Sequence, residues 1–193
     1  MKIEVRSDGA HISGYVNAVQ RESLPVITPH GRVNEEIEPG AFAAALERGG
    51  DIPLTVDHEE RVYASTGDGS MQLHEDNIGL HADVWIKDTE LTETARSGGI
   101  RGWSFGMRNV RDELEHRTDA LPLRHVKGFE LDHLTLVVHK TPAYSATSVE
   151  VRAETEETTE IRSAAEEAQI TEETPRFDNS AFHARVEAAK NRK

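Results

Sequence analysis

The stretch that decides the fold of this chain is GWSFGM, residues 102–107. Small and large residues alternate along it, and alternation with period two is the pattern of a β-strand whose two faces differ. The tryptophan, phenylalanine and methionine therefore face a core, and Ser104 lies between two glycines on the opposite face, which has no large side chain. Glycine weakens a strand but lets another backbone approach closely, which suits a hydroxyl that meets a substrate. Taken alone, a serine between glycines is more typical of a bend or a bulge.

Short strands separated by Gly, Asp, Asn and Pro extend on both sides of this stretch, from residue 2 to about residue 152. That pattern is typical of a mostly antiparallel barrel or sandwich. Strands are expected at residues 3–6, 12–19, 52–56, 70–74, 79–86, 102–110, 121–127 and 131–138. Two brief helices are expected, one over residues 39–46 with Pro39 in its first turn and one from Asp88 to about Gly98. The residues thus predict a mostly β fold with a few helices, in the α+β class.

The composition narrows the classes of protein to consider. A chain of 193 residues with 36% hydrophobic residues can form one domain with a core. No cysteine is present, so disulfides, thiolate metal sites and a cysteine nucleophile are excluded. A formal charge of −13 repels a phosphate backbone, and no apolar run approaches the length of a membrane helix. We therefore expect a soluble, cytoplasmic protein that binds another protein rather than nucleic acid or a membrane.

The composition changes near residue 152. Glu, Thr and Ala dominate the segment that follows, and no alternating pattern continues through it. We therefore divide the chain into a domain over residues 1–152 and an acidic tail over residues 153–193. The tail is expected to be disordered, or else to be a docking or removable segment; residues 163–169 and 180–190 could form helical turns only with a partner.

His58 is the candidate base for a serine nucleophile. It follows the apolar strand at 52–56, within DHEE at residues 57–60, where a loop would hold the ring near solvent. A serine hydroxyl needs such an imidazole to take its proton, and an ordinary histidine pKa suits that task near neutral pH. The alternative is a surface histidine in an acidic turn. A metal site built on His58 and Glu59 is weakly supported, because two histidines at helical spacing are lacking.

Five segments in order give the chain a resemblance to a known family. They are GY (residues 14–15), an E-x-x-x-P-G-A-F element (residues 35–42), DH (57–58), SFG (104–106) and a closing strand that leads to PAY (142–144). Over roughly residues 12–150 the chain resembles the prohead maturation serine proteases of tailed phages, which are related to herpesvirus assemblin. The resemblance implies an assemblin-like closed β-barrel with flanking helices, with Ser104 as nucleophile and His58 as base.

The third catalytic residue is left open between two neighbours. The family often has a Glu in the closing strand where this chain has His133, whereas assemblin-type proteases use a second histidine, so the resemblance favours His133. Asp132 is the alternative, since a buried carboxylate can orient an imidazole. Strand alternation puts Asp132 and His133 on opposite faces, and this placement does not show which of the two is the third catalytic residue. An oxyanion donor is not identified, although Arg101, Arg108 and Arg124 are candidates.

The function implied by the resemblance is a capsid-maturation endopeptidase. Through an acyl-enzyme on Ser104, it would cleave the scaffolding segment of the major capsid protein and its own chain, inside the prohead in the cytoplasm of the bacterial host. A homodimer is a further implied partner, and no metal or organic cofactor is implied. The alternative is a non-catalytic capsid scaffolding or assembly protein on the same fold.

Overall fold

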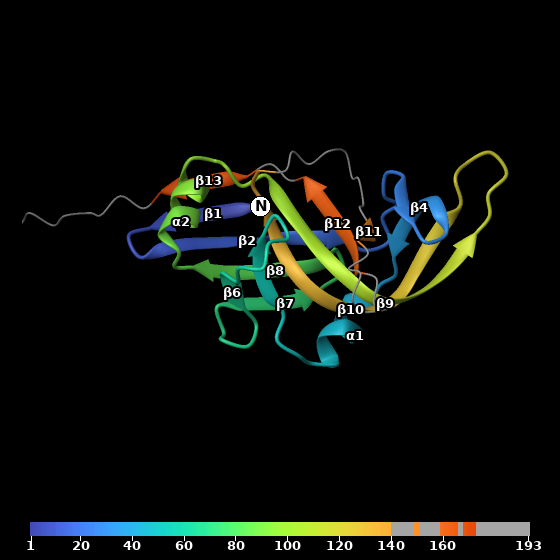
Figure 1. The fold of residues 1–193 in the computed structure, drawn as a ribbon, viewed down its shortest axis with the longest axis horizontal. Helices are drawn as coiled ribbons and strands as arrows, with labels where there is room; N and C mark the ends of the chain where they lie inside the picture. The colour runs from blue at the N-terminus through green and yellow to red at the C-terminus, as the bar shows by residue number, and fades with distance from the viewer. Residues whose placement is uncertain (140–148, 151–158, 166–167, 173–193) are drawn as a thin grey trace, which may run out of the picture.

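The computed structural model describes residues 1–139, 149–150, 159–165 and 168–172. Strands dominate it, and two short helices, α1 (Ala41–Glu47) and α2 (Thr89–Arg96), lie against them (Figure 1). The predicted mostly β, α+β class is confirmed. Neither of the described helices combines the length and the apolar content that a bilayer-spanning helix needs.

One sheet has five strands in the order β13-β1-β2-β8-β7. The strands are β1 (Lys2–Arg6), β2 (Gly9–Ala18), β7 (Met71–Glu75), β8 (Gly79–Ile86) and β13 (Gln169–Glu172). β8 shows why the chain is extended here: every second side chain from Leu80 to Ile86 is buried, and the residues between them are more exposed. All pairs are antiparallel except β1 and β13, which run parallel.

The second sheet carries the candidate catalytic residues. Its order is β11-β12-β9-β10-β4-β3, and β5 pairs with β10 and with β6 beside this path. The strands are β3 (Val26–Thr28), β4 (Gly31–Ile37), β5 (Pro53–Val56), β6 (Ala64–Ser65), β9 (Gly102–Glu115), β10 (Leu123–Val137), β11 (Val149–Glu150) and β12 (Thr159–Ala165). β9 and β10 form a long curved hairpin through the molecule (Figure 1).

The closed barrel implied by the resemblance is not what the described strands form. The first path ends at β13 and β7, the second ends at β11 and β3, and neither returns to its first strand. One reason is that β10 changes partners: residues 123–126 pair with β4, and residues 134–136 pair with β5. The expectation is corrected to two open sheets.

β10 also corrects the expectation of two separate strands at 121–127 and 131–138. It is one strand that pairs with β9 along its length, with three shifts of register between Val126 and His133. The first and third shifts leave an extra residue on β10, and the second leaves one on β9. Such bulges bend a strand and increase its twist. The bends produce the interruption in the hydrophobic pattern that suggested two strands.

The core is built around aromatic side chains next to the second sheet. Phe42 of α1 meets Phe105 and Phe129 edge-on, with ring centroids 5.4 and 5.1 Å apart. Trp103, Phe105 and Met107 all belong to the buried core, as the alternation in GWSFGM predicts. The carboxylate of Glu75 accepts hydrogen bonds from the N–H groups of Gly40 and Ala43, which anchors the start of α1 to β7.

Two segments of the expected tail are strands. Residues 159–165 form β12, which pairs antiparallel with β9, and residues 168–172 include β13, which pairs with β1. Ile161 is buried, and Glu160 and Arg162 are buried beside it. The described residues of 163–169 are not helical, so the helical turn expected there is wrong for them. The turn expected at 180–190 lies outside the described residues, and a disordered or removable tail stays a prediction. The division between residues 152 and 153 stays a prediction.

Candidate active site

Ser104 lies in β9 between two neighbouring strands. Thr135 of β10 stands opposite it on one side, and Ser163 of β12 stands opposite it on the other. The side chain is fully buried, with 0% of its surface exposed. Its hydroxyl lies 3.0 Å from Nε2 of His58, within the distance a nucleophile and its base require.

His58 lies in a turn after β5 that is held in an uncommon backbone conformation. Asp57 and His58 have positive φ values of 48° and 63°, a region that costs a non-glycine residue about 1–2 kcal/mol. The Asp57 carboxylate accepts hydrogen bonds from the N–H groups of Val138 (2.9 Å) and His139 (2.8 Å). The N–H of His58 donates to Oγ1 of Thr135 at 3.1 Å. These bonds tie the turn to β10 and keep the imidazole beside Ser104.

A continuous path of polar contacts leads away from Ser104. Nδ1 of His58 lies 2.8 Å from Nε2 of His133, and the two rings are nearly perpendicular, at 83°. Nδ1 of His133 lies 2.8 Å from Oδ2 of Asp132. Behind this carboxylate, Nε of Arg108 lies 2.8 Å from Oδ1 of Asp132. The path therefore runs from hydroxyl to imidazole, to a second imidazole, to a carboxylate paired with a guanidinium.

One assignment of protons satisfies the path with both imidazoles neutral. Ser104 donates to Nε2 of His58, the Nδ1–H of His58 donates to Nε2 of His133, and the Nδ1–H of His133 donates to Asp132. In this assignment Nε2 of His58 is unprotonated and faces the hydroxyl. The arrangement can accept a proton from Ser104 and stabilise the imidazolium that results.

A β-bulge explains how two consecutive residues both take part in this path. Leu131 pairs with Met107 and His133 pairs with the adjacent Gly106, so Asp132 is the extra residue on β10. A regular strand would turn Asp132 and His133 to opposite faces, but a bulge interrupts this alternation. The two candidates for the third residue are therefore arranged in series, with His133 next to His58 and Asp132 behind His133.

The imidazole of His133 fills the space that Gly106 leaves open. A Cβ atom at position 106 would lie 2.6 Å from Cε1 of His133, 2.8 Å from its Nδ1 and 3.0 Å from Cγ2 of Thr159. The sequence predicts that the glycines around Ser104 admit a substrate backbone. In the structure, Gly106 instead admits the ring that contacts His58.

We therefore expect Gly106→Ala to reduce activity roughly 100-fold, since a displacement of about 1 Å in a catalytic group can have this effect. The added methyl group must push the His133 ring away from its present position. Gly128→Ala is the matched control: its Cβ would also meet an atom at 2.6 Å, but this atom is Nη2 at the free end of the Arg111 side chain, which can move aside. Steady-state rates of the two variants on one substrate check this; equal rates would contradict it.

β12 flanks Ser104 on the side away from β10. The carbonyl oxygen of Arg162 accepts a hydrogen bond from the Ser104 hydroxyl at 2.7 Å. The single proton of this hydroxyl thus has two acceptors within reach, Arg162 O and His58 Nε2. β12 therefore engages the candidate nucleophile directly.

A buried cluster of charges holds β12 in place. Arg162 donates two hydrogen bonds to Glu35 of β4, with Nε at 2.5 Å from Oε1 and Nη2 at 2.7 Å from Oε2. Glu160 pairs with Arg124 of β10, whose Nη2 lies 2.8 Å from Oε1, and Arg124 also contacts Glu35 and Asp112. Burial by itself would lower the pKa of Arg162, but Glu35 and Glu160 outweigh it and raise this pKa. The cluster thus keeps Arg162 of β12 charged and joins β12 to β4 and β10 through ion pairs.

We expect this cluster to stabilise the fold less as the pH falls. Burial by itself would raise the pKa of Glu160, but hydrogen bonds from Arg124 and the charges of Arg162 and Arg124 outweigh it, so the pKa lies below its ordinary value of 4.5. A carboxyl whose pKa falls on folding stabilises the protein above its unfolded pKa, and this contribution is lost as the pH drops through the folded pKa. Between about pH 5 and pH 3, the urea midpoint of the wild type should fall more steeply than that of Glu160→Gln.

The control for this comparison is Glu47→Gln, which removes an exposed carboxyl at the end of α1. Its midpoint should follow the wild-type pH dependence, because Glu47 makes no buried ion pair among the described contacts. A Glu160→Gln variant with the wild-type slope would show that Glu160 does not carry the effect.

The structure brings the predicted site residues together and separates the candidate oxyanion donors. His58, Ser104, His133 and Asp132 are contiguous. Arg108 pairs with Asp132, Arg124 is buried in the charge cluster, and Arg101 is exposed. In the described part of the chain, no three His, Asp or Glu side chains are grouped so that they could hold a metal ion.

Two residues near Ser104 were missed by sequence reasoning. Thr135 accepts the N–H of His58 and receives a hydrogen bond from Thr55 at 3.0 Å. A signal for it existed, because Thr135 shares a strand face with His133. Arg162 gave no such signal, since it lies in the segment interpreted as a tail.

Comparison with known proteins identifies a family. The family model described as caudovirus prohead serine protease matches residues 1–161. Searches of curated proteins and of solved structures find no match to this chain. The matched range includes every residue of the polar path and extends into β12.

Proposed function

Because the chain belongs to the caudovirus prohead serine proteases, we propose that it is a serine endopeptidase with Ser104 as nucleophile, His58 as general base and His133 as the residue that orients His58. Asp132 orients His133 in turn. The observation that carries this proposal is the unbroken path from Ser104 Oγ through His58 to His133, with contacts of 3.0 and 2.8 Å. These distances match what proton transfer between a nucleophile and its base needs.

The proposed reaction follows from the positions of the protons. Ser104 Oγ attacks the carbonyl carbon of a peptide bond while Nε2 of His58 takes the hydroxyl proton. The imidazolium that forms is stabilised through its Nδ1–H by His133, whose own Nδ1–H is held by Asp132. His58 then gives the proton to the leaving amine, and water hydrolyses the acyl-enzyme with His58 again as base.

The proposed substrates are the scaffolding segment of the major capsid protein and the chain itself, cut inside the prohead in the host cytoplasm. Membership in a family of prohead serine proteases supports an activity tied to the prohead. That a homodimer forms, that residues 153–193 are a removable tail, and that no nucleic acid, membrane or cofactor takes part stay predictions from the sequence.

The test is coexpression of the full chain with the major capsid protein that accompanies it, followed by intact mass measurement of both. A capsid protein shortened at one defined bond, only when the active chain is present, supports the proposal. Unchanged masses together with assembled particles would overturn it.

A second candidate function has one observation in its favour. Ser104 is fully buried and its hydroxyl contacts a carbonyl of the neighbouring strand β12, as expected if it never meets a substrate. A non-catalytic capsid assembly protein on this fold would show that property. It predicts that changing the Ser104–His58–His133 path alters neither the mass of the capsid protein nor particle assembly.

A further inference from the structure

β12 lies where a peptide would add to the edge of β9. It is an extended segment that runs antiparallel to β9, with Glu160 opposite Met107 and Ala165 opposite Gly102. Adding a strand to a sheet edge is a common way for a protein to bind a peptide, because backbone hydrogen bonds supply affinity and side-chain pockets supply specificity. The chain thus presents its own residues 159–165 to its candidate nucleophile as an extended peptide.

Within this segment, one peptide bond lies at Ser104. The carbonyl oxygen of Arg162 is 2.7 Å from Ser104 Oγ, and the same Oγ is 3.0 Å from the candidate base His58. In the β12–β9 register, the next residue, Ser163, stands directly opposite Ser104. The bond between Arg162 and Ser163 is therefore the bond of β12 that faces the nucleophile and its base.

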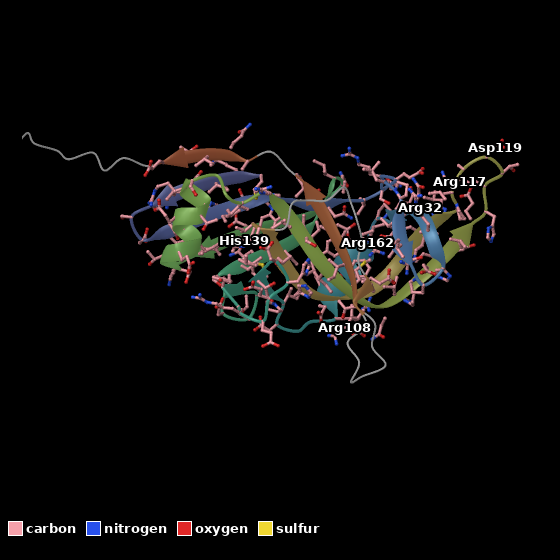
Figure 2. All side chains as sticks on the ribbon, turned by 45° about the horizontal axis from the view of Figure 1, so that its top comes forward. Arg32, Arg108, Arg117, Asp119, His139 and Arg162 are labelled. Atoms are coloured by element: carbon pink, nitrogen blue, oxygen red, sulfur yellow. The ribbon has the colours of Figure 1, made fainter. Side chains whose placement is uncertain are left out.

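The side chain before this bond enters a buried site of opposite charge. Arg162 lies well inside the molecule in Figure 2, whereas Asp119 is at the tip of the β9–β10 hairpin. The guanidinium of Arg162 donates two hydrogen bonds to the carboxylate of Glu35. This geometry suits arginine in particular, because a guanidinium donates two parallel hydrogen bonds to a carboxylate. Glu35 lies on β4, outside the path from Ser104 to Asp132, and it belongs to the E-x-x-x-P-G-A-F element to which the mechanism gives no role.

A second side chain of the segment is also recognised. Glu160, two residues before Arg162, lies on the same strand face and pairs with Arg124 of β10 at 2.8 Å. The site therefore fits an acidic residue two positions before a basic one. Arg124 contacts Glu35 as well, so the two recognition residues hold each other in position.

We propose that the bond between Arg162 and Ser163 is the bond at which this chain cleaves itself, and that Glu35 selects the basic residue before the cut. This rests on the proposed protease function. Ser104 Oγ bonds to the carbonyl carbon of Arg162, and His58 takes the hydroxyl proton. The C–N bond to Ser163 breaks, and His58 protonates the new amine. Water then hydrolyses the ester, which leaves a carboxylate on Arg162 and restores Ser104.

The test begins with intact mass and terminal sequencing of the full chain during incubation, alone and with the capsid protein. A piece that begins at Ser163 and one that ends at Arg162, formed at a rate independent of protein concentration, are expected. Capsid protein that is cut while the chain stays whole, or is cut elsewhere, would overturn this inference and leave the proposed function standing. If neither protein is cut, both proposals fail.

Two substitutions of Arg162, together with one of Glu35, test the role of Glu35. Arg162→Lys keeps the charge but not the two parallel hydrogen bonds to Glu35, so its cleavage should be slower than that of the wild type and faster than that of Arg162→Gln. Arg162→Gln should slow cleavage about ten- to a hundredfold, the effect expected from losing hydrogen bonds between charged groups. Glu35→Gln should slow cleavage of the wild-type segment to a similar degree. The matched control is Arg117→Gln, which removes a guanidinium paired with Glu22 near the tip of the β9–β10 hairpin, away from Arg162 (Figure 2). Cleavage of Arg162→Gln at the wild-type rate and at the same bond would overturn the role of Glu35.

A structural effect must be separated from recognition in these variants. Each is therefore also made with Ser104→Ala, in which no cut can occur, and its urea midpoint is measured. If Arg162→Lys and Arg162→Gln have similar midpoints but different cleavage rates, recognition by Glu35 is supported. If the rates simply follow the midpoints, β12 is held by the cluster without being selected by it, and this part of the inference fails.

Discussion

Replacing Ser104 with alanine is expected to abolish all processing and to leave the protein folded. Loss of the nucleophile in a serine protease lowers the rate by about six orders of magnitude. The fold should survive because Ser104 is buried on a strand between β10 and β12, where a methyl group fits without a clash. The lost hydrogen bond to Arg162 O costs about 1 kcal/mol. The measurement is the intact mass of the capsid protein and of the chain after incubation.

Ser65→Ala is the matched control for this variant. Ser65 is also a buried serine on a strand, and its hydroxyl accepts a hydrogen bond from the N–H of Asp68 outside the catalytic path. Processing by Ser65→Ala should equal that of the wild type. If the Ser104→Ala chain processes either substrate at a comparable rate, Ser104 is not the nucleophile.

His133→Ala is expected to lower the rate by up to about four orders of magnitude, the effect of losing the group that orients a catalytic histidine. Its Nε2 is the contact of His58 Nδ1, at 2.8 Å. Without it, His58 loses the acceptor that selects its tautomer. Asp132→Ala should be milder, roughly ten- to a hundredfold, because Asp132 reaches His58 only through His133, much as an outer-shell carboxylate acts on a metal-bound histidine. Values of kcat and KM for both variants on one peptide check this order.

His125→Ala is the control on the same strand. His125 lies on β10 and contacts Glu36 and Glu115, away from Ser104. Its kcat should remain near that of the wild type. A larger loss for Asp132→Ala than for His133→Ala would reverse the assignment of the third residue.

The strands that frame the site could be predicted from the sequence because their signals are local. The alternation in GWSFGM predicted the core face of β9, and the alternation in residues 79–86 predicted β8 with its observed bounds. The pairing of Ser104 with His58 came from the resemblance rather than from spacing. It could not have come from spacing, since the two residues are 46 positions apart and meet only because β5 and β9 both pair with β10.

Two features of the site could not be read locally. The bulge at Asp132 depends on the register of β9 against β10, and alternation within β10 alone separated two residues that in fact form one path. The strand β12 has few apolar residues, and it is held by charges whose partners are distant: Arg162 and Glu35 are 127 positions apart. A segment rich in charge is interpreted as solvated when its partners are unknown.

Because β1 pairs in parallel with β13, cleavage of the bond between Arg162 and Ser163 would not by itself release the part of the chain that follows the bond. β13 follows the bond between Arg162 and Ser163, and its residues from Gln169 to Glu172 are held against Lys2 to Val5. All four β13 residues are exposed, so this ladder is a weak clasp made mainly of backbone hydrogen bonds. A molecule nicked at residue 162 would keep this ladder, and it would stay a two-chain complex until the ladder opens, whole by native mass spectrometry and divided on a denaturing gel. The lifetime of that clasp, rather than the chemistry at Ser104, would then set when the end of the chain is shed.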